Sequence, residues 1–239
     1  CDWSSDVCSS DLAELNAFTE IIPGLRYLDC VSGACVYDLK EKKTLYSQVL
    51  DPGIVKKLME FGMEEGAMIH VLSERSIVQK DQQSHMADFH MGIYQTMFDQ
   101  ITDKLENIYN SFCEEPFPVL KLNLYHRDEA SRARTVERIK AASLETALAL
   151  AESTSLECSA KGIDKGVGLK KLCEHLGLPL EQTIAVGDAD NDTMALKTAG
   201  LAVAMGNATE PIKALADVIV ADCDHNGCAE AIDKYLLAD

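Results

Sequence analysis

The last third of the chain alternates regularly between helical and strand-like segments, and this constrains the fold more than any other feature. From Gly162 onward, short apolar runs such as TIAVGD and LAVAMG alternate with helical patterns such as DKGVGLKKLCEHLG. Apolar strands without polar alternation are typical of parallel sheets covered on both faces, because the connection between parallel strands usually holds a helix. The sequence therefore predicts a doubly wound α/β layer in this region.

One junction in this layer carries a dense group of acidic residues. The run AVGDADND places Asp188 directly after a strand, and Asp190 and Asp192 at the start of the next helix. Ligands bind at the carboxyl ends of strands in open α/β sheets, and Mg²⁺ is commonly held there by one or two carboxylates and a phosphate. A cation among these acids explains the group, and so does ordinary capping of the helix N-terminus.

A lysine at the start of the helix DKGVGLKKLCEHLG helps to distinguish a cation site from ordinary helix capping. The positive end of the helix dipole disfavours Lys165 at this place unless an anion lies close by. A bound phosphate, or the aspartates of AVGDADND, would supply that anion. We therefore expect Lys165 to lie near Asp188 and Asp192, with a solvated lysine on an exposed first turn as the alternative.

The preceding part of the chain has a mixed pattern. LRYLDCVSGACVYD favours strands with a turn at Ser32, and DPGIVKKLMEFGMEEG predicts a helix that is capped by Asp51 and closed by Gly66. AMIHVLS and PVLKLNLYH predict strands, whereas TMFDQITDKLENIYNSF and DEASRARTVERIKAAS predict helices, the second one started by Asp128. SLETALALAESTSLECSA fits either a helix or two strands. Because no linker separates these elements, a second domain has to be an insertion before the α/β layer.

Charge and hydropathy narrow the functional classes. The 239 residues include 22 basic and 39 acidic side chains, which gives a formal net charge of −17. This charge disfavours unaided binding to nucleic acid or to an anionic membrane. No apolar run reaches the length of a membrane span, and the N-terminal residues lack the pattern of a signal peptide. We therefore expect a cytoplasmic protein.

Two further features of the sequence are its cysteines and its N-terminal residues. The nine cysteines are scattered, and several lie in apolar runs, which favours reduced thiols over a disulfide framework. The run CDHNGC offers Cys223, His225 and Cys228 as zinc ligands, but it lacks a second ligand pair. The opening CDWSSDVCSSDL has no hydrophobic period, so we interpret residues 1–12 as a non-native-looking leader outside the fold.

Four motifs in the last third resemble the C-terminal half of the Cof-type phosphatases of the haloacid dehalogenase superfamily. They are K-G-x-x-L from Lys165, G-D-x-x-N-D around Asp188, A-G-x-x-V-A-M-x-N-A up to Ala208, and G-x-A-x-A-I from Gly227. VSGACVYD is similar to the family's N-G-A-x-V-Y-D segment, with Ser32 in place of asparagine. The resemblance implies a doubly wound parallel, Rossmann-like core over residues 13–50 and 156–239. It also implies an inserted α+β cap domain of the C2 type over residues 51–155, which selects the substrate.

The resemblance further implies a Mg²⁺-dependent phosphomonoester hydrolase that acts on small phosphorylated metabolites, such as sugar phosphates, through an aspartyl-phosphate. Carried over by position, Lys165 is the catalytic lysine that binds phosphate and orients the nucleophile. Asp188 is then a metal ligand, and Asp192 supports the metal or its waters. Asn191 lines the phosphate site. Asn207 is a further phosphate-binding candidate, and formation of a turn explains this asparagine equally well.

The family's nucleophile segment, D-x-D-G-T, and its T-G-R-like loop do not occur in this sequence. DVIVADCDHNG offers Asp222 and Asp224 after a strand, but no Gly-Thr follows, and we expect a surface turn there. The sequence thus predicts an inactive and poorly stable truncated copy, because an uncovered sheet edge would remain beside TIAV. Two alternatives stay open: a non-catalytic phosphate-sensing or partner-binding module of the same fold, and an α/β domain whose acidic turn binds nothing.

Overall fold

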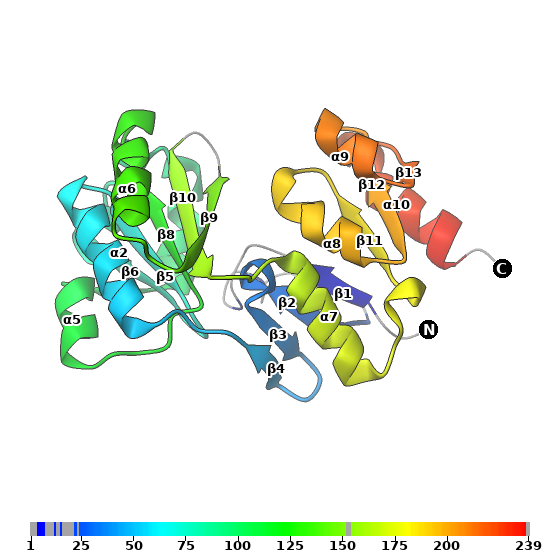
Figure 1. Ribbon diagram of the computed structural model, residues 1–239, viewed down its shortest axis with the longest axis horizontal. Coiled ribbons are helices and arrows are strands. Elements are labelled where there is room, and N and C mark those ends of the chain that lie inside the picture. Colours follow the sequence, from blue (N-terminus) through cyan, green and yellow to red (C-terminus); the bar gives the residue numbers. More distant parts are fainter. Residues whose placement is uncertain are drawn as a thin grey trace. The chain divides into compact units, whose positions relative to one another are not determined.

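The computed structural model describes residues 4–7, 12, 15, 22, 24–151 and 154–237, and for residues 4–7 and 151 it describes the backbone only. The chain divides into two compact units (Figure 1). We call Ser47–Ile163 the inserted unit. The core unit consists of Arg26–Tyr46 and Asp164–Asp239 together with residues 5–7 near the N-terminus. Each unit is described by itself.

The boundaries of the inserted unit differ from the expected residues 51–155. Strand β10 (Ser155–Ala160), which was expected in the core, pairs with two strands of the inserted unit, so the boundary lies after Ile163. At the other end, the Leu50 amide donates to the Val119 carbonyl at 2.8 Å, which ties the incoming chain to this unit. Of the expected core segment 13–50, most of residues 13–23 lie outside the described residues.

The inserted unit is built on a sheet with the strand order β7-β6-β5-β8-β10-β9 among the described residues. All pairs are antiparallel except β6 with β7. Three helices cover one face of this sheet and enclose the main apolar core (Figure 1). The strands are β5 (Met68–Leu72), β6 (Ser76–Gln79), β7 (Thr102–Leu105), β8 (Lys121–Tyr125), β9 (Thr146–Ala151) and β10, and the helices are α2 (Pro52–Glu64), α5 (Ile108–Glu114) and α6 (Glu129–Ala141).

Two of these helices begin at the residues that the sequence predicted. Asp51 Oδ1 accepts hydrogen bonds from the amides of Gly53 and Ile54 at 2.8 and 3.2 Å. Asp128 Oδ1 accepts from the amide of Ser131 at 2.7 Å. Each carboxylate satisfies amides that have no partner within the first helical turn. The predictions of α2 and α6 are therefore confirmed.

One predicted helix of the inserted unit is wrong in its middle. The run TMFDQITDKLENIYNSF forms helix α4 (Gln95–Ile101), then strand β7, then helix α5. The Thr102 hydroxyl donates to the Phe98 carbonyl at 2.6 Å, and the backbone from Thr102 onward pairs with β6. Pairing with a strand distant in sequence has overridden the local helical pattern. The ambiguous run before Lys161 forms the hairpin of β9 and β10 rather than a helix.

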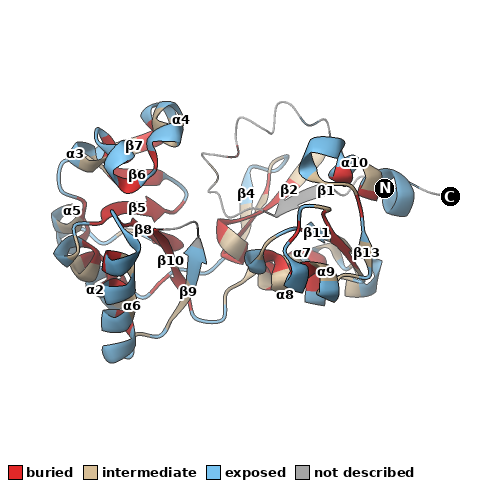
Figure 2. Ribbon diagram, turned by 90° about the horizontal axis from the view of Figure 1, so that it is seen from above, coloured by how far each residue is buried: buried red, intermediate tan, exposed pale blue. Residues whose placement is uncertain are grey.

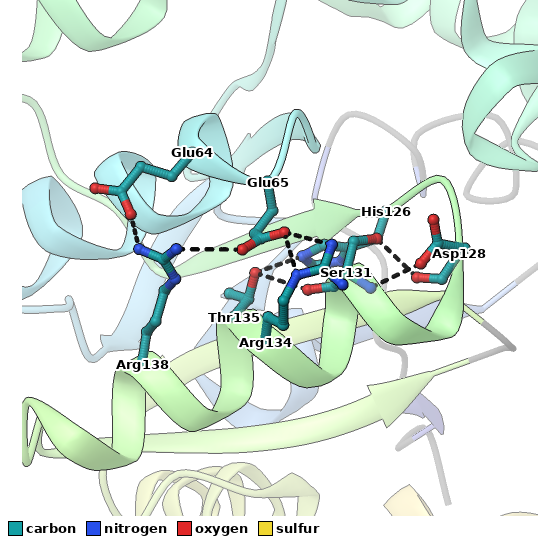
Figure 3. A network of polar contacts seen from close by, with 8 residues as sticks. All are labelled: Glu64, Glu65, His126, Asp128, Ser131, Arg134, Thr135 and Arg138. Atoms are coloured by element: carbon teal, nitrogen blue, oxygen red, sulfur yellow. Dashed lines mark hydrogen bonds and ion pairs between the residues drawn. The ribbon is translucent and has the colours of Figure 1, made fainter.

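An ion-pair network joins α2 to α6 (Figure 3). Glu65 follows the last residue of α2, and its carboxylate lies 2.7 Å from Arg134 and 3.4 Å from Arg138. Glu64 pairs with Arg138 as well. Acidic groups at a helix C-terminus are disfavoured by the helix dipole, so these arginines offset an intrinsic cost. The buried His126 belongs to the group of polar contacts drawn in Figure 3, with Nε2 2.8 Å from the Thr135 hydroxyl.

The core unit contains a parallel sheet with the order β11-β12-β13 among the described residues. Ala202 and Ala204 pack against α8 and α9 on one face, while Val203 and Met205 pack against Ala231 of α10 on the other. The predicted doubly wound layer is thus confirmed. Its elements are α7 (Lys165–Leu176), β11 (Ile184–Gly187), α8 (Thr193–Thr198), β12 (Leu201–Ala204), α9 (Glu210–Leu215), β13 (Val218–Ile219), α10 (Gly227–Ala231) and a π-helical turn (Ile232–Leu236).

The early strands form a second sheet of the core unit, with the order β1-β2-β3-β4. Among the described residues it is separate from the parallel sheet, so β11 is an edge strand and Val186 is 37% exposed. Residues 4–7, which were expected to lie outside the fold, form β1. The strands are β1 (Ser4–Val7), β2 (Leu25–Cys30), β3 (Cys35–Asp38) and β4 (Lys43–Ser47).

Candidate functional site

The predicted site residues lie at the carboxyl end of β11 and at the start of α7, both in the core unit. Asp188 follows β11 directly, and the residues Asp190–Asp192 form a short 3-10 turn before α8. Lys165 is the first residue of α7, whose N-terminus is capped by the Asp164 carboxylate accepting from the Val167 amide at 3.0 Å. The helix therefore begins where the local sequence predicts, with its lysine in the first turn.

Lys165 and Asp192 form a buried ion pair. The ammonium donates to Asp192 Oδ1 at 2.6 Å, and the two residues are only 7% and 8% exposed. Asp192 Oδ2 accepts from the backbone amides of Asp188 and Ala189 at 3.0 and 3.2 Å. The anion that the first turn of α7 required is thus Asp192, and this carboxylate also fixes the backbone of the acidic turn.

Two glycines of the motifs allow this pair to form. A Cβ at Gly166 would lie 2.5 Å from the Met194 carbonyl oxygen, and a Cβ at Gly187 would lie 2.5 Å from the Asp192 Cβ. Side chains at these positions would separate α7 from α8, or β11 from the turn that follows it. The glycines next to Lys165 and Asp188 therefore set the distance that brings the ammonium to the carboxylate.

Asp188 is exposed, and Asn207 holds its side chain. Asp188 Oδ2 accepts from Asn207 Nδ2 at 2.9 Å, and the Asp188 carbonyl accepts from the Thr209 amide at 3.1 Å. Asn207 Oδ1 accepts from the Cys223 amide at 3.0 Å. Asn207 thus links the loops that follow all three strands of the parallel sheet. Its side chain organises these loops, which is the structural role that the sequence left open beside phosphate binding.

The remaining sequence candidates lie in exposed turns. Asn191 is exposed in the turn between Asp188 and Asp192. Asp222 Oδ1 lies 2.5 Å from His225 Nδ1 and accepts from the Asp224 amide at 3.1 Å. The hydrogen bond from His225 lowers the pKa of Asp222. Asp222 and Asp224 therefore belong to a surface turn, as expected.

The donor groups fit a largely hydrated cation better than a tightly chelated one. Among the described residues, no group of three His, Cys, Asp or Glu side chains is placed to hold a metal, and this includes Cys223, His225 and Cys228. Both oxygens of Asp192 are hydrogen-bonded, whereas Asp188, which directly follows the strand, and Asp190 are exposed carboxylates of this turn that remain accessible to a cation. Mg²⁺ usually keeps several waters and takes one or two carboxylates with a phosphate. The turn fits Mg²⁺ in that manner.

Sequence reasoning missed Asp29, which lies near the end of β2 and is fully buried. A Cβ at Gly168 would lie 1.9 Å from Asp29 Oδ1, so this carboxylate lies directly against the first turns of α7. A Cβ at Gly33 would lie 2.0 Å from the Asp164 carbonyl oxygen, which places the turn after β2 against the same helix end. The available signal in the sequence was an aspartate between the apolar residues of YLDCV.

Comparisons with known proteins agree with this arrangement. Residues 14–232 match the family model described as haloacid dehalogenase-like hydrolase. Because the match covers most of the chain, the protein belongs to the haloacid dehalogenase-like hydrolases, as the Cof-type motifs indicate.

Curated relatives match about a third of the chain. Phosphatase YwpJ of Bacillus subtilis is 46% identical over 83 residues, which are 35% of this chain and 29% of that protein. A phosphoglycolate phosphatase of Methanopyrus kandleri is 46% identical over 76 residues, or 32% of this chain and 33% of its own length. The matched region therefore spans about a third of either relative.

Solved structures extend the likeness to the whole fold. A haloacid dehalogenase-like hydrolase from Bacteroides thetaiotaomicron superposes with a TM-score of 0.81 at 23% identity, covering 96% of this chain and 85% of that one. A sugar phosphatase of haloacid dehalogenase subclass IIB gives a TM-score of 0.79 at 20% identity, covering 98% and 85%. At these identities the likeness shows the fold: the α/β core with an inserted domain is confirmed.

Proposed function

We propose that the protein is a phosphatase of small phosphorylated metabolites, such as sugar phosphates, that uses Mg²⁺ at the turn after β11. The observation that carries this proposal is the buried contact of Lys165 with Asp192, made at the N-terminus of α7 and beside the exposed Asp188. Free amides at a helix N-terminus and a neighbouring ammonium together favour a phosphate group. The name of one curated relative, a phosphoglycolate phosphatase, gives a small phosphorylated substrate for that protein, and phosphatase YwpJ is named for the same class of reaction.

Each residue has a distinct part in the proposed site. Asp188 holds Mg²⁺, which when bound neutralises charge on the phosphoryl oxygens. Lys165 contributes a second positive charge and is held in position by Asp192, whose carboxylate also orients the turn. Asn207 fixes the side chain of Asp188. Asn191 is exposed in the same turn and donates its amide to the phosphate.

No D-x-D-G-T run occurs in residues 1–239, so the attacking carboxylate of the family has no counterpart in this sequence. Covalent catalysis needs such a nucleophile. We therefore propose that this polypeptide by itself binds phosphate and Mg²⁺ without turnover. The non-catalytic alternative, a phosphate-sensing module, makes the same prediction for binding, and the upstream reading frame separates the two.

Thermal unfolding with Mg²⁺ and inorganic phosphate tests the binding site. We expect the two ligands together to raise the Tm by several degrees, and more than either ligand alone, because ligands that bind the folded state stabilise it. Asp188→Asn should abolish the effect of Mg²⁺ while leaving the Tm without ligand nearly unchanged, since Asp188 is exposed. Asp190→Asn, in the same exposed turn, is the matched control and should keep the full shift.

Hydrolysis of p-nitrophenyl phosphate tests turnover. The unmodified polypeptide should bind without hydrolysing the ester. Mg²⁺-dependent hydrolysis that disappears in Asp188→Asn would show that the polypeptide is an active enzyme, and it would refute the proposal of binding without turnover. Absence of any shift with Mg²⁺ and phosphate would instead refute the binding site.

A further inference from the structure

Two cysteines of the core unit lie directly opposite each other where β2 turns into β3. In the antiparallel register of these strands, Cys30 is the partner of Cys35. Directly opposite residues of an antiparallel pair place their side chains on the same face of the sheet. Both residues are present as thiols in the structure. The register therefore makes two thiols neighbours on one face of the sheet.

The backbone separation of this pair suits a disulfide bond. The Leu39 amide donates to the Arg26 carbonyl at 2.8 Å, which continues the register of β2 and β3. Hydrogen-bonded and non-hydrogen-bonded pairs alternate along an antiparallel ladder, so Cys30 and Cys35 form a hydrogen-bonded pair with Cα atoms about 5.5 Å apart. This separation is close to the commonest value in disulfides, about 5.5–6 Å.

The Cβ atoms of the pair are further apart than a relaxed disulfide needs. Directly opposite residues have Cβ atoms about 4.5–5.5 Å apart, whereas disulfides join Cβ atoms about 3.5–4.5 Å apart. The two strands therefore have to approach by about 1 Å when the bond forms. Strain of this kind makes a disulfide easier to reduce, so the geometry favours a reversible bond over a permanent one.

The turn between the cysteines holds them in this register. Val31, Ser32 and Gly33 have φ values of 55°, 57° and 91°, in the left-handed region that a β-branched residue rarely adopts. The Ala34 amide donates to the Val31 carbonyl at 3.2 Å. A Cβ at Gly33 would lie 2.0 Å from the carbonyl oxygen of Asp164, the residue that caps α7. Packing against the helix end therefore keeps the turn in an uncommon conformation.

Burial determines which oxidant can reach the pair. The last four residues of β2 are buried (Figure 2), and Cys30 and Cys35 are 0% and 4% exposed. The reactive form of cysteine is the thiolate, and apolar surroundings disfavour it. The first step therefore needs a small oxidant and a local opening of the hairpin. The second step joins groups that the register already holds together, so it is intramolecular and fast.

We propose that Cys30 and Cys35 are a site of reversible oxidation, at which hydrogen peroxide joins the two thiols in a disulfide bond. The Cys35 thiolate attacks one peroxide oxygen and the O–O bond breaks. The departing hydroxide takes up the proton of the Cys35 thiol and leaves as water, and Cys35 becomes a sulfenic acid. The Cys30 thiol then attacks this sulfur, the S–S bond forms, and the S–O bond breaks with release of a second water. A thiol reductant reverses the reaction. This inference is independent of the proposed phosphate site.

Mass spectrometry of the full chain tests the proposal without any substitution. The protein is treated with hydrogen peroxide, the excess is removed with catalase, and the chain is unfolded in iodoacetamide and digested with trypsin. Cleavage after Arg26 and Lys40 gives residues 27–40, a peptide that contains Cys30 and Cys35 and no other cysteine. We expect this peptide to be lighter by two hydrogen atoms and to carry no alkyl group. Reduction with dithiothreitol before alkylation should restore two alkylated cysteines.

Cys158 is the matched control, because it is equally buried in a strand but has no cysteine opposite. Its partners in the register are Leu122 and Leu148, and it is 0% exposed. Burial also raises the pKa of its thiol. After the same treatment, residues 141–161 should still take up one alkyl group at Cys158. In the variant Cys35→Ser, Cys30 should likewise take up one alkyl group.

The result that overturns the proposal is equally direct. Residues 27–40 would still take up two alkyl groups after a peroxide dose that oxidises the exposed Cys113. A disulfide from Cys30 to any cysteine other than Cys35, found as a peptide of combined mass, would also contradict it. Oxidation of Cys158 to the same extent would show that register does not select the pair.

Discussion

At the residue scale, the pair of Lys165 and Asp192 sets the geometry of the acidic turn. Each charge is buried, and each compensates the desolvation of the other. A buried ion pair of this kind contributes little net stability compared with apolar residues, but removal of one member leaves the other uncompensated. The pair therefore matters for position more than for stability, because it holds an ammonium at the helix N-terminus, where we propose that a phosphate binds.

Lys165→Met should lower the free energy of unfolding by about 3–5 kcal/mol, because Asp192 would remain buried without its cation. Lys170→Met, at an exposed position of the same helix, should change it by about 0.5 kcal/mol or less. Urea unfolding of the three proteins measures both differences. Equal effects of the two substitutions would show that the buried pair is not formed in solution.

Gly168→Ala tests how closely Asp29 approaches α7. Alanine in place of a mid-helix glycine would by itself stabilise the helix by about 1 kcal/mol. Here the new Cβ would lie 1.9 Å from Asp29 Oδ1, so we expect a net loss of about 1–3 kcal/mol. Gly62→Ala is the control, since the atoms nearest to its Cβ belong to the flexible Leu124 side chain, with a terminal carbon nearest at 2.7 Å. A stabilising Gly168→Ala would contradict the described position of Asp29.

At the element scale, the junction of α2 and α6 depends on Glu65 rather than on the neighbouring Glu64. The Glu65 side chain is 7% exposed and contacts both Arg134 and Arg138, whereas Glu64 is 50% exposed and contacts Arg138 (Figure 3). The hydrogen bond with Glu65 raises the pKa of Arg134. Most surface ion pairs contribute little to the free energy of unfolding. A carboxylate that is partly buried and pairs with two arginines is an exception.

Glu65→Gln should therefore lower the free energy of unfolding by about 1 kcal/mol or more, whereas Glu64→Gln should change it by about 0.5 kcal/mol or less. The loss in Glu65→Gln should shrink when unfolding is measured in high salt, because salt screens the partly exposed arginines. If the free energy of unfolding falls equally in both variants, the junction is held by apolar packing and not by these charges.

The elements that the sequence predicted correctly are those with strong local signals. Asp51, Asp128 and Asp164 each precede a helix and cap it, and the apolar runs of β11 and β12 form parallel strands. The failures occurred where strand pairing decided the conformation. Strand β7 follows a helical pattern yet pairs with β6, and β10 joins β8 in the inserted unit although the expected boundary placed it in the core.

At the scale of the whole molecule, two buried histidines link folding to pH. His70 and His126 lie in the inserted unit, and both are at most 1% exposed. Burial lowers the pKa of His70 to about 3 and also lowers the pKa of His126. The unfolded chain therefore binds protons more readily than the folded one below the ordinary histidine pKa of about 6.5. The contribution of the two neutral histidines to stability is present above about pH 6.5. It is lost as the pH falls from there toward the pKa of each histidine in the folded state.

His70 alone should lower the free energy of unfolding by about 2 kcal/mol between pH 8 and pH 5. His70→Gln should be less stable at pH 8, because Ser76 and Tyr125 lose their partner, but its stability should fall less steeply with acid. His85→Gln, at an exposed histidine, should retain the original pH dependence. Denaturant midpoints across this pH range measure the three slopes, and parallel slopes for all three proteins would contradict a neutral buried His70.

The sequence by itself determined the α/β class, the helix N-termini and the turn that carries Asp188, since these depend on residues adjacent along the chain. It also indicated that Lys165 needs an anion, because the helix dipole acts within one turn. Only the tertiary structure decided which carboxylate supplies it, that Asp29 lies against α7, and that Asn123 and Ser155 share one sheet face. Each of these arrangements joins residues that are far apart in the sequence. They are fixed by the register of paired strands and by close packing at glycines, and neither leaves a signal in the neighbouring residues of the chain.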